Sequence, residues 1–180
     1  MRAVMTSMVL AFGLAAGVAG PSAAQLAVHR SPTHAPELGT TIRGSAPTVF
    51  SISTSGGVIR QSGDAIRLSN SSVRTPTVTI SCGPNRLESL CALRYIRVRI
   101  IPASSQGQAA ITRLRVGSLS GGRYSLGGAP SEGAVVEFIM APLGLFGGDA
   151  SFELGMDVRL AAGAPGGRHV FDYIVTAELL

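Results

Sequence analysis

The sequence predicts an all-β fold, one antiparallel β-sandwich of about seven to eight strands preceded by a signal peptide. Three observations predict it. Apolar and polar residues alternate in segment after segment, which is the pattern of half-buried strands. Clusters of glycine, proline, serine and aspartate separate these segments, as turns do. No helical periodicity occurs after the N-terminal apolar stretch. A small β-barrel is the alternative architecture.

The N-terminus has the order of a secretory signal peptide. Arg2 supplies one positive charge, an apolar stretch runs from Val4 to Gly20, and the small residues Ser22 and Ala24 occupy the positions that a signal peptidase recognises. We therefore place the cleavage between Ala24 and Gln25. The alternative is a transmembrane anchor, but the apolar stretch has about 17 residues, interrupted by glycines, which is at the short limit for a membrane span.

Removal of residues 1–24 leaves 180 − 24 = 156 residues, which is enough for one domain with a real core. Residues 25–47 are rich in Pro, Thr, Ser, Gly and His and predict an extended, partly disordered lead-in. Residues 48–180 are expected to form a single β-sandwich domain. No later stretch is apolar for long enough to span a membrane, so we expect no transmembrane helix in the mature chain. The expected location is extracytoplasmic: the periplasm, the outer surface or secreted.

The first four predicted strands lie in the first half of this domain. Each has apolar residues at every second position, and Ser, Thr or Arg between them, so that one face is buried and the other meets water. Their apolar residues are Phe50 and Ile52; Ile66 and Leu68; Val78, Ile80 and Cys82; and Ile96, Val98 and Ile100.

The last four predicted strands follow the same rule, with Glu, Asp and Arg on the wet face. Glycine-rich turns such as Gly121-Gly122 and Gly147-Gly148-Asp149 separate them. Their apolar residues are Leu114 and Val116; Val136, Phe138 and Met140; Phe152, Leu154, Met156, Val158 and Leu160; and Phe171, Tyr173, Val175, Ala177 and Leu179.

The charge pattern argues against a nucleic-acid partner. The formal net charge is +5 and all 15 basic residues are arginine. They are scattered along the chain instead of forming one basic run, and aromatic residues make up only 5% of the sequence. Proteins that bind single strands place aromatic side chains among their basic ones, because the bases stack on them. Solvated strand faces account for the arginines better.

The two cysteines, Cys82 and Cys91, most simply form one disulfide in an exported chain. A metal pair is the alternative, but a metal needs further ligands. His29, His34 and His169 are far from both cysteines in the sequence and lack a ligand spacing. We therefore predict a disulfide that closes the loop between two strands, with no metal site and no cofactor.

A search for catalytic groups predicts that the protein is not an enzyme. The nearest approach to a nucleophile elbow has Leu119 where a serine is required. His169 follows a glycine-rich turn and is expected to be a surface residue. Asp64 is expected to be a turn residue bonded to its own backbone, because no acidic neighbours complete a calcium loop. Glu153 and Asp157 share a strand face but are too far apart for a retaining carboxylate pair.

Three segments carry a family resemblance: residues 48–68, residues 75–82 and residues 163–176. In these segments the chain resembles the bacterial family catalogued as domain of unknown function 4402. It departs from the family pattern at Arg168-His169, where the family more often has tyrosine and small polar residues. The resemblance implies an exported, immunoglobulin-like β-sandwich related to pilin and surface-appendage domains, and it supplies no catalytic residues.

Two functions are compatible with these expectations. The first is a structural or adhesive cell-surface subunit, pilin-like, that contacts itself or other surface subunits through strand addition. The lead-in and the alternating C-terminal run motivate it. The alternative is a monomeric periplasmic or secreted module whose glycine-rich loops hold a ligand, with Arg86, Arg123 and Tyr124 as the expected contacts.

Overall fold

The computed structural model describes residues 26–32, 36–82, 93–103, 108–144 and 148–180. Within these ranges the protein is all-β: twelve strands form three antiparallel sheets, and no helix occurs. The predicted all-β sandwich is confirmed. The predicted signal peptide and its cleavage between Ala24 and Gln25 lie outside the described residues, so both remain predictions.

The strands follow the chain in this order: β1 (Ala27–Ser31), β2 (Thr40–Ile42), β3 (Thr48–Ile52), β4 (Val58–Ser62), β5 (Ile66–Arg67), β6 (Thr77–Ser81), β7 (Ile96–Pro102), β8 (Ala109–Val116), β9 (Val136–Met140), β10 (Ala150–Leu160), β11 (Gly167–Arg168) and β12 (Tyr173–Leu179). The largest sheet has the order β1-β6-β10-β3-β4, with β8 also paired to β10. The second sheet is β12-β7-β9, and the smallest is β11-β2-β5.

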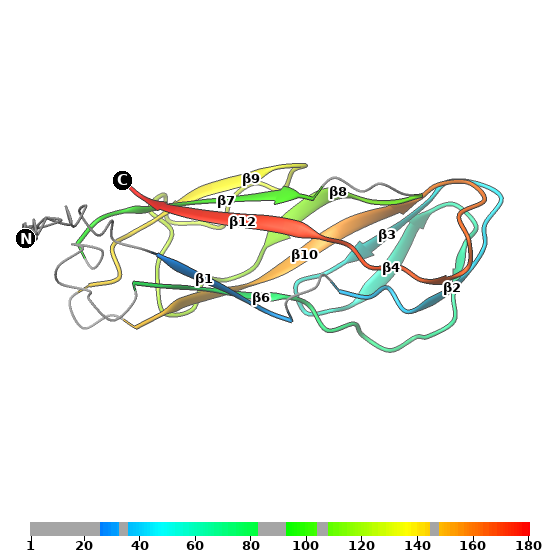
Figure 1. The fold of residues 1–180 in the computed structure, drawn as a ribbon, viewed down its shortest axis with the longest axis horizontal. Helices are drawn as coiled ribbons and strands as arrows, with labels where there is room; N and C mark the ends of the chain where they lie inside the picture. The colour runs from blue at the N-terminus through cyan, green and yellow to red at the C-terminus, as the bar shows by residue number, and fades with distance from the viewer. Residues whose placement is uncertain (1–25, 33–35, 83–92, 104–107, 145–147) are drawn as a thin grey trace, which may run out of the picture.

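The long strand β10 organises the largest sheet. The first part of β10 pairs with β6, through Ala150–Glu153, and its second part pairs with β3, through Met156–Leu160. From Leu154 onward β10 also pairs with β8. In Figure 1, β12, β7 and β9 lie along one long side of the molecule and β1 and β6 along the other. β10 therefore links strands that are far apart in the sequence.

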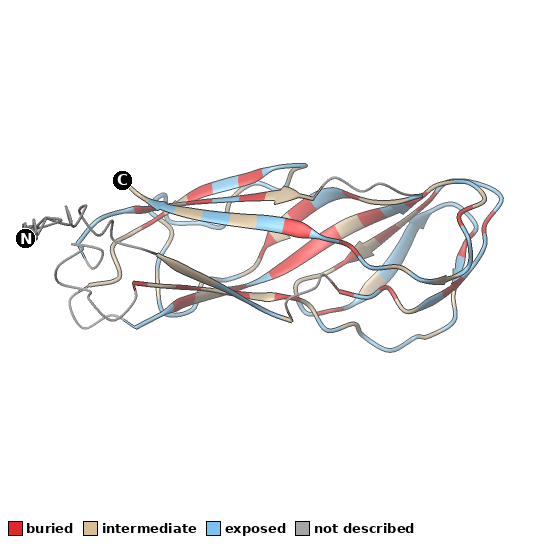
Figure 2. Ribbon diagram, in the orientation of Figure 1, coloured by how far each residue is buried: buried red, intermediate tan, exposed pale blue. Residues whose placement is uncertain are grey.

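The core lies between the largest sheet and β12-β7-β9. The inward side chains of β7 and β10, among them Val98 and Leu154, are fully buried. Two phenylalanines join the layers: the rings of Phe138 on β9 and Phe152 on β10 meet edge to face, with centroids 5.5 Å apart. Figure 2 shows the alternation of buried and exposed positions along β9, as expected for a sheet with one wet face.

The eight alternating runs of the sequence coincide with β3, β5, β6, β7, β8, β9, β10 and β12. In the run at β5 the expected burial is wrong: Ile66 is 51% exposed and Leu68 is 60% exposed, because β5 lies at the edge of the smallest sheet. The structure contains four further strands that the sequence pattern did not predict: β1, β2, β4 and β11. β1 and β2 fall in the predicted lead-in, residues 25–47, so the partly disordered segment expected there is in fact paired at 27–31 and 40–42. The physical reason for β1 is that Leu26 and Val28 pack against the core.

Candidate functional site

Of the two cysteines predicted to form a disulfide, the structure describes Cys82. Cys82 follows directly after β6 and is 6% exposed. Cys91 lies outside the described residues, so the pairing of the two cysteines remains a prediction. Among the described residues, no group of three or more His, Cys, Asp and Glu could hold a metal ion. No helix in these same ranges is long and apolar enough to cross a membrane.

Arg168 and His169, the point of departure from the family pattern, join the smallest sheet to its surroundings. Arg168 forms an ion pair with Glu37. The His169 ring Nε2 lies 3.2 Å from the Thr41 hydroxyl, and the His169 carbonyl accepts a hydrogen bond from Leu38. His169 therefore fastens β2 to the segment after β11.

Of the three residues expected to contact a ligand, Tyr124 instead makes contacts within the protein. Its hydroxyl donates to the Gly117 carbonyl at 2.6 Å, and its ring meets Phe138 edge to face. Burial raises the pKa of Tyr124. Arg123 is exposed and its carbonyl accepts from Ala141, whereas Arg86 lies outside the described residues.

Asp64 closes a loop between distant parts of the chain. Its carboxylate accepts hydrogen bonds from the Ser45 amide at 3.0 Å, the Ser45 hydroxyl at 2.6 Å and the Ala46 amide at 2.9 Å. These bonds lower the pKa of Asp64 from 3.8 to about 2. The expected hydrogen bond of Asp64 to its own backbone is the smallest contribution to this lowering, and the larger contributions come from Ser45 and Ala46, 19 and 18 positions earlier. Sequence spacing could not show this contact.

We predict that Asp64→Asn removes part of the acid sensitivity of the fold. The folded pKa is depressed, so the stabilisation is complete above about pH 4 and is lost as the pH falls toward about 2. The melting temperature of the wild type should thus drop more between these pH values than that of Asp64→Asn. The control is Asp172→Asn, at an exposed carboxylate in the same domain. Parallel pH profiles for wild type and Asp64→Asn would contradict the assignment.

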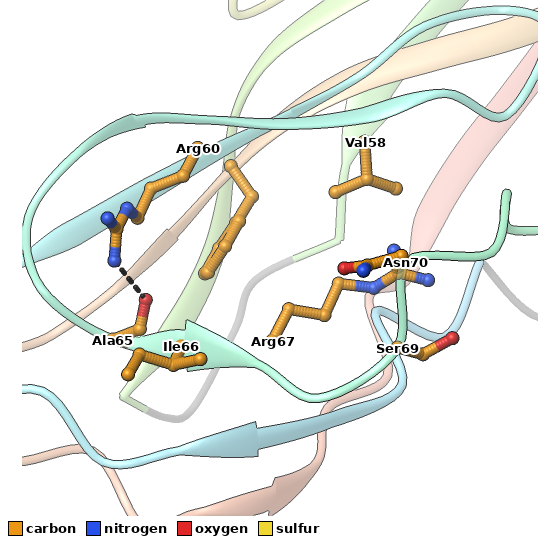
Figure 3. A pocket seen from close by; sticks show the side chains of 8 residues that line it. Val58, Arg60, Ala65, Ile66, Arg67, Ser69 and Asn70 are labelled. Carbon is orange, nitrogen blue, oxygen red and sulfur yellow. Dashed lines mark hydrogen bonds between the residues drawn. The ribbon is translucent and has the colours of Figure 1, made fainter.

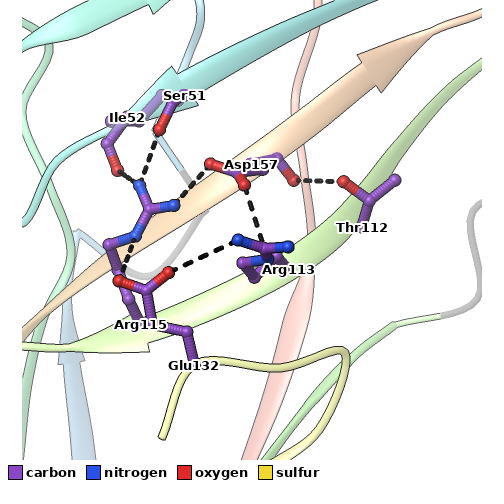
Figure 4. A network of polar contacts seen from close by, with 7 residues as sticks. All are labelled: Ser51, Ile52, Thr112, Arg113, Arg115, Glu132 and Asp157. Carbon is purple, nitrogen blue, oxygen red and sulfur yellow. Dashed lines mark hydrogen bonds and ion pairs between the residues drawn. The ribbon is translucent and has the colours of Figure 1, made fainter. Parts of the chain in front are cut away.

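A polar network covers the outer face of β3, β8 and β10 (Figure 4). The Arg115 guanidinium donates to Asp157 at 2.6 Å, to the Ser51 hydroxyl at 2.8 Å and to the Ile52 carbonyl at 3.0 Å. It also donates to Glu132 at 3.2 Å. Four of the five N–H groups of Arg115 are thus occupied, which leaves little capacity for a ligand. The network holds strands together.

The candidate functional site is the open edge, by which we mean the free edges of β1 and β12. Each is the last strand of its sheet among the described residues. Arg30 on β1 joins them, since its Nη1 donates to the Tyr173 carbonyl at 2.7 Å. The Arg30 guanidinium also lies 5.4 Å from the centroid of the Tyr173 ring, within the range of a cation–π contact. The Arg30 side chain therefore bridges the free edges of β1 and β12.

Tyr173 lies beneath this contact. It is 1% exposed, and its hydroxyl has no hydrogen-bond partner within the part of the chain that the structure describes. Burial raises the pKa of Tyr173 to about 12, and the charge of Arg30 opposes that shift. The hydroxyl is therefore neutral at physiological pH and can donate or accept a hydrogen bond.

The apolar rows at the open edge are incompletely covered. On β12 the inward residues Val175, Ala177 and Leu179 are only partly buried. The β7 residues opposite them in register, Ile100, Val98 and Ile96 respectively, are fully buried. The same gradient occurs on the other sheet, where Val28 of β1 is partly buried and its partner Ile80 on β6 is fully buried.

The backbone of β12 also faces the open edge. Leu180 donates to the Tyr95 carbonyl and Ala103 donates to the Asp172 carbonyl. Because hydrogen-bonded pairs alternate in an antiparallel ladder, the even-numbered residues from 172 to 180 bond to β7. The amides and carbonyls of Tyr173, Val175, Ala177 and Leu179 therefore point away from β7. The bond from Arg30 to the Tyr173 carbonyl agrees with this direction.

Arg30 is a site residue that the sequence analysis missed, because it lies in the predicted lead-in. A signal was present: Leu26, Val28 and Arg30 share one parity, so an alternating row leads to an arginine on the inward face. In comparisons with protein-family models, with curated proteins and with solved structures, nothing matched this chain. The resemblance to the domain of unknown function 4402 family therefore remains a prediction.

Proposed function

We propose that the protein is an exported structural or adhesive subunit of the cell surface, which joins other copies or other surface subunits by strand addition at the open edge. The observation that supports this most is the row Val175, Ala177 and Leu179, whose side chains are partly uncovered and whose main-chain groups point outward. An added strand would cover the apolar row and satisfy the main chain at once.

The role of the lead-in changes in this proposal. The sequence leaves open whether the lead-in donates a strand, but β1 pairs with β6 along its whole length, from Ala27 opposite Ser81 to Ser31 opposite Thr77. Donation of β1 would break that pairing. We therefore assign β1 to the accepting side, with the donor strand supplied by another subunit.

The test is the variant Ala177→Pro. Proline has no amide hydrogen, and the amide of Ala177 points to the open edge and not to β7, so the ladder with β7 should remain intact. In cells expressing the tagged protein, chemical cross-linking followed by gel electrophoresis should give a ladder of linked species for the wild type. The Ala177→Pro variant should give mainly the monomer band.

The matched control is Thr176→Ala, because Thr176 is the neighbour of Ala177 and its exposed side chain lies on the other face of β12. It should retain the ladder of species, and all three proteins should have similar melting temperatures. A wild type that yields only monomer after cross-linking would contradict strand addition and would favour the alternative, a monomeric ligand-binding module. An unchanged ladder in Ala177→Pro would place the contact elsewhere.

A further inference from the structure

A second accessible feature, separate from the open edge, is a pocket between β4 and β5. β4 is the last strand of the largest sheet and β5 is the last strand of the smallest, and they belong to different sheets although they are consecutive in the chain. Between them is a cavity of about 420 Å³, which we call the β4–β5 pocket. The lining residues are Phe50, Val58, Arg60, Ala65, Ile66, Arg67, Ser69 and Asn70.

The side chains around the β4–β5 pocket combine positive charge with apolar surface. Figure 3 shows Arg60 and Arg67 at opposite ends of the group and Val58 on the β4 side. Among the lining residues that the structure describes, none is an aspartate or a glutamate. Ile66, which is 51% exposed, extends the apolar surface to its cross-strand partner Ile42, which is 47% exposed. The pocket therefore complements a ligand that carries both carboxylates and aliphatic groups.

Both arginines keep donors free for such a ligand. Arg60 donates to the Ala65 carbonyl at 3.1 Å, which occupies one of its five N–H groups. Arg67 donates to the Leu38 carbonyl at 2.6 Å and to the Ser71 carbonyl at 2.8 Å, which occupies two. Arg67 is partly buried, and this burial lowers its pKa. A carboxylate beside a guanidinium in such surroundings forms a strong, charge-assisted hydrogen bond.

We propose that the β4–β5 pocket binds an extended acidic peptide, which places carboxylates at Arg60 and Arg67 and aliphatic side chains against Val58 and Ile66. The two free strand edges favour a peptide, because an extended main chain can pair with a strand edge and a saccharide cannot. Side chains of alternating chemistry suit a strand, since successive residues point to opposite faces.

An inward-pointing charge on an edge strand can also serve only to prevent unwanted pairing, and Arg60 fits that description. The two roles predict different results for Arg60→Gln. Removal of a blocking charge should increase self-association and leave peptide affinity unchanged. Removal of a ligand contact should weaken peptide binding by about tenfold.

The test uses a fluorescein-labelled peptide of about eight residues that alternates valine and glutamate, a length typical of a strand. Fluorescence anisotropy with the purified protein should show saturable binding that weakens with added salt. The peptide with glutamine in place of glutamate should bind about tenfold more weakly. Equal affinity of the two peptides would overturn the proposal, as would saturable binding of an acidic oligosaccharide without binding of the peptide.

Paired variants locate the site. Val58→Glu places a carboxylate inside the pocket and should weaken binding by at least about tenfold. Its control is Ile59→Glu, because the adjacent residue points to the opposite face of β4 and does not line the pocket. Arg60→Gln should also bind about tenfold more weakly, whereas Arg43→Gln, at an exposed arginine outside the pocket, should bind as the wild type does. Equal effects within either pair, at similar melting temperatures, would overturn the proposal.

Discussion

Replacement of Phe152 by alanine is expected to lower the free energy of unfolding by about 3–5 kcal/mol. Phe152 is 2% exposed and lies where β10 pairs with β6, opposite the fully buried Val78. Its ring also meets the ring of Phe138 from the other sheet. Truncation therefore removes contacts within one sheet and between two, and the surrounding strands cannot close over the space without shifting the register. Urea unfolding followed by circular dichroism would measure the change.

Two further variants show whether the loss comes from the core. Phe152→Leu keeps most of the volume, so its cost should be clearly smaller than that of the alanine variant. Ile59→Ala also truncates an apolar side chain, but one that is 66% exposed, and it should change the stability by less than about 0.5 kcal/mol. If Phe152→Ala cost no more than Ile59→Ala, the contact between the two sheets would not be as described.

The parity of the long strands could be predicted from the sequence, for a simple physical reason. Where one face of a strand is buried and the other is wet, the two-residue period shows directly which side chains point inward. Val175, Ala177 and Leu179 illustrate this, because the sequence placed all three on the inward face of a C-terminal strand. The period does not show how completely each residue is covered, which depends on the neighbouring strand.

The four added strands lack that signal. In β4, Val58 and Ile59 are adjacent apolar residues, followed by three polar ones, because an edge strand has less surface to bury. β2 (Thr-Thr-Ile) and β11 (Gly-Arg) contain no alternation of apolar and polar residues. β1 ends in polar and charged residues, His29, Arg30 and Ser31, so it looks like a loop.

The sites depend on contacts between distant residues, which a single sequence does not contain. Arg30 meets Tyr173 across 143 positions, and Asp64 meets Ser45 across 19. The sequence pattern predicts that arginines on strands are solvated, and this holds for Arg113, whose side chain is 57% exposed. It fails for Arg115, which is only 17% exposed. The difference is local: a β-carbon on Gly155 would lie 2.7 Å from the Arg115 Cγ, so the glycine makes room for the arginine to lie across β10.

The pair formed by Arg115 and Asp157 leads to the second large prediction. Asp157→Ala is expected to destabilise the protein by about 3 kcal/mol, because it leaves the guanidinium of Arg115 without its closest counterion. The Asp157 side chain is 14% exposed, so water cannot readily replace it. Glu153→Ala is the control on the same face of β10, and since Glu153 is exposed it should cost less than about 0.5 kcal/mol.

A double-mutant cycle separates the pair from its surroundings. Arg115→Met retains much of the aliphatic stem that covers Gly155 but removes the charge. In the double variant neither charge remains unpaired, so its loss of stability should be smaller than the sum of the two single losses by about 1–3 kcal/mol. Chemical unfolding of the four proteins measures this difference. Additive losses would mean that Ser51, Ile52 and Glu132, and not Asp157, hold Arg115 in place.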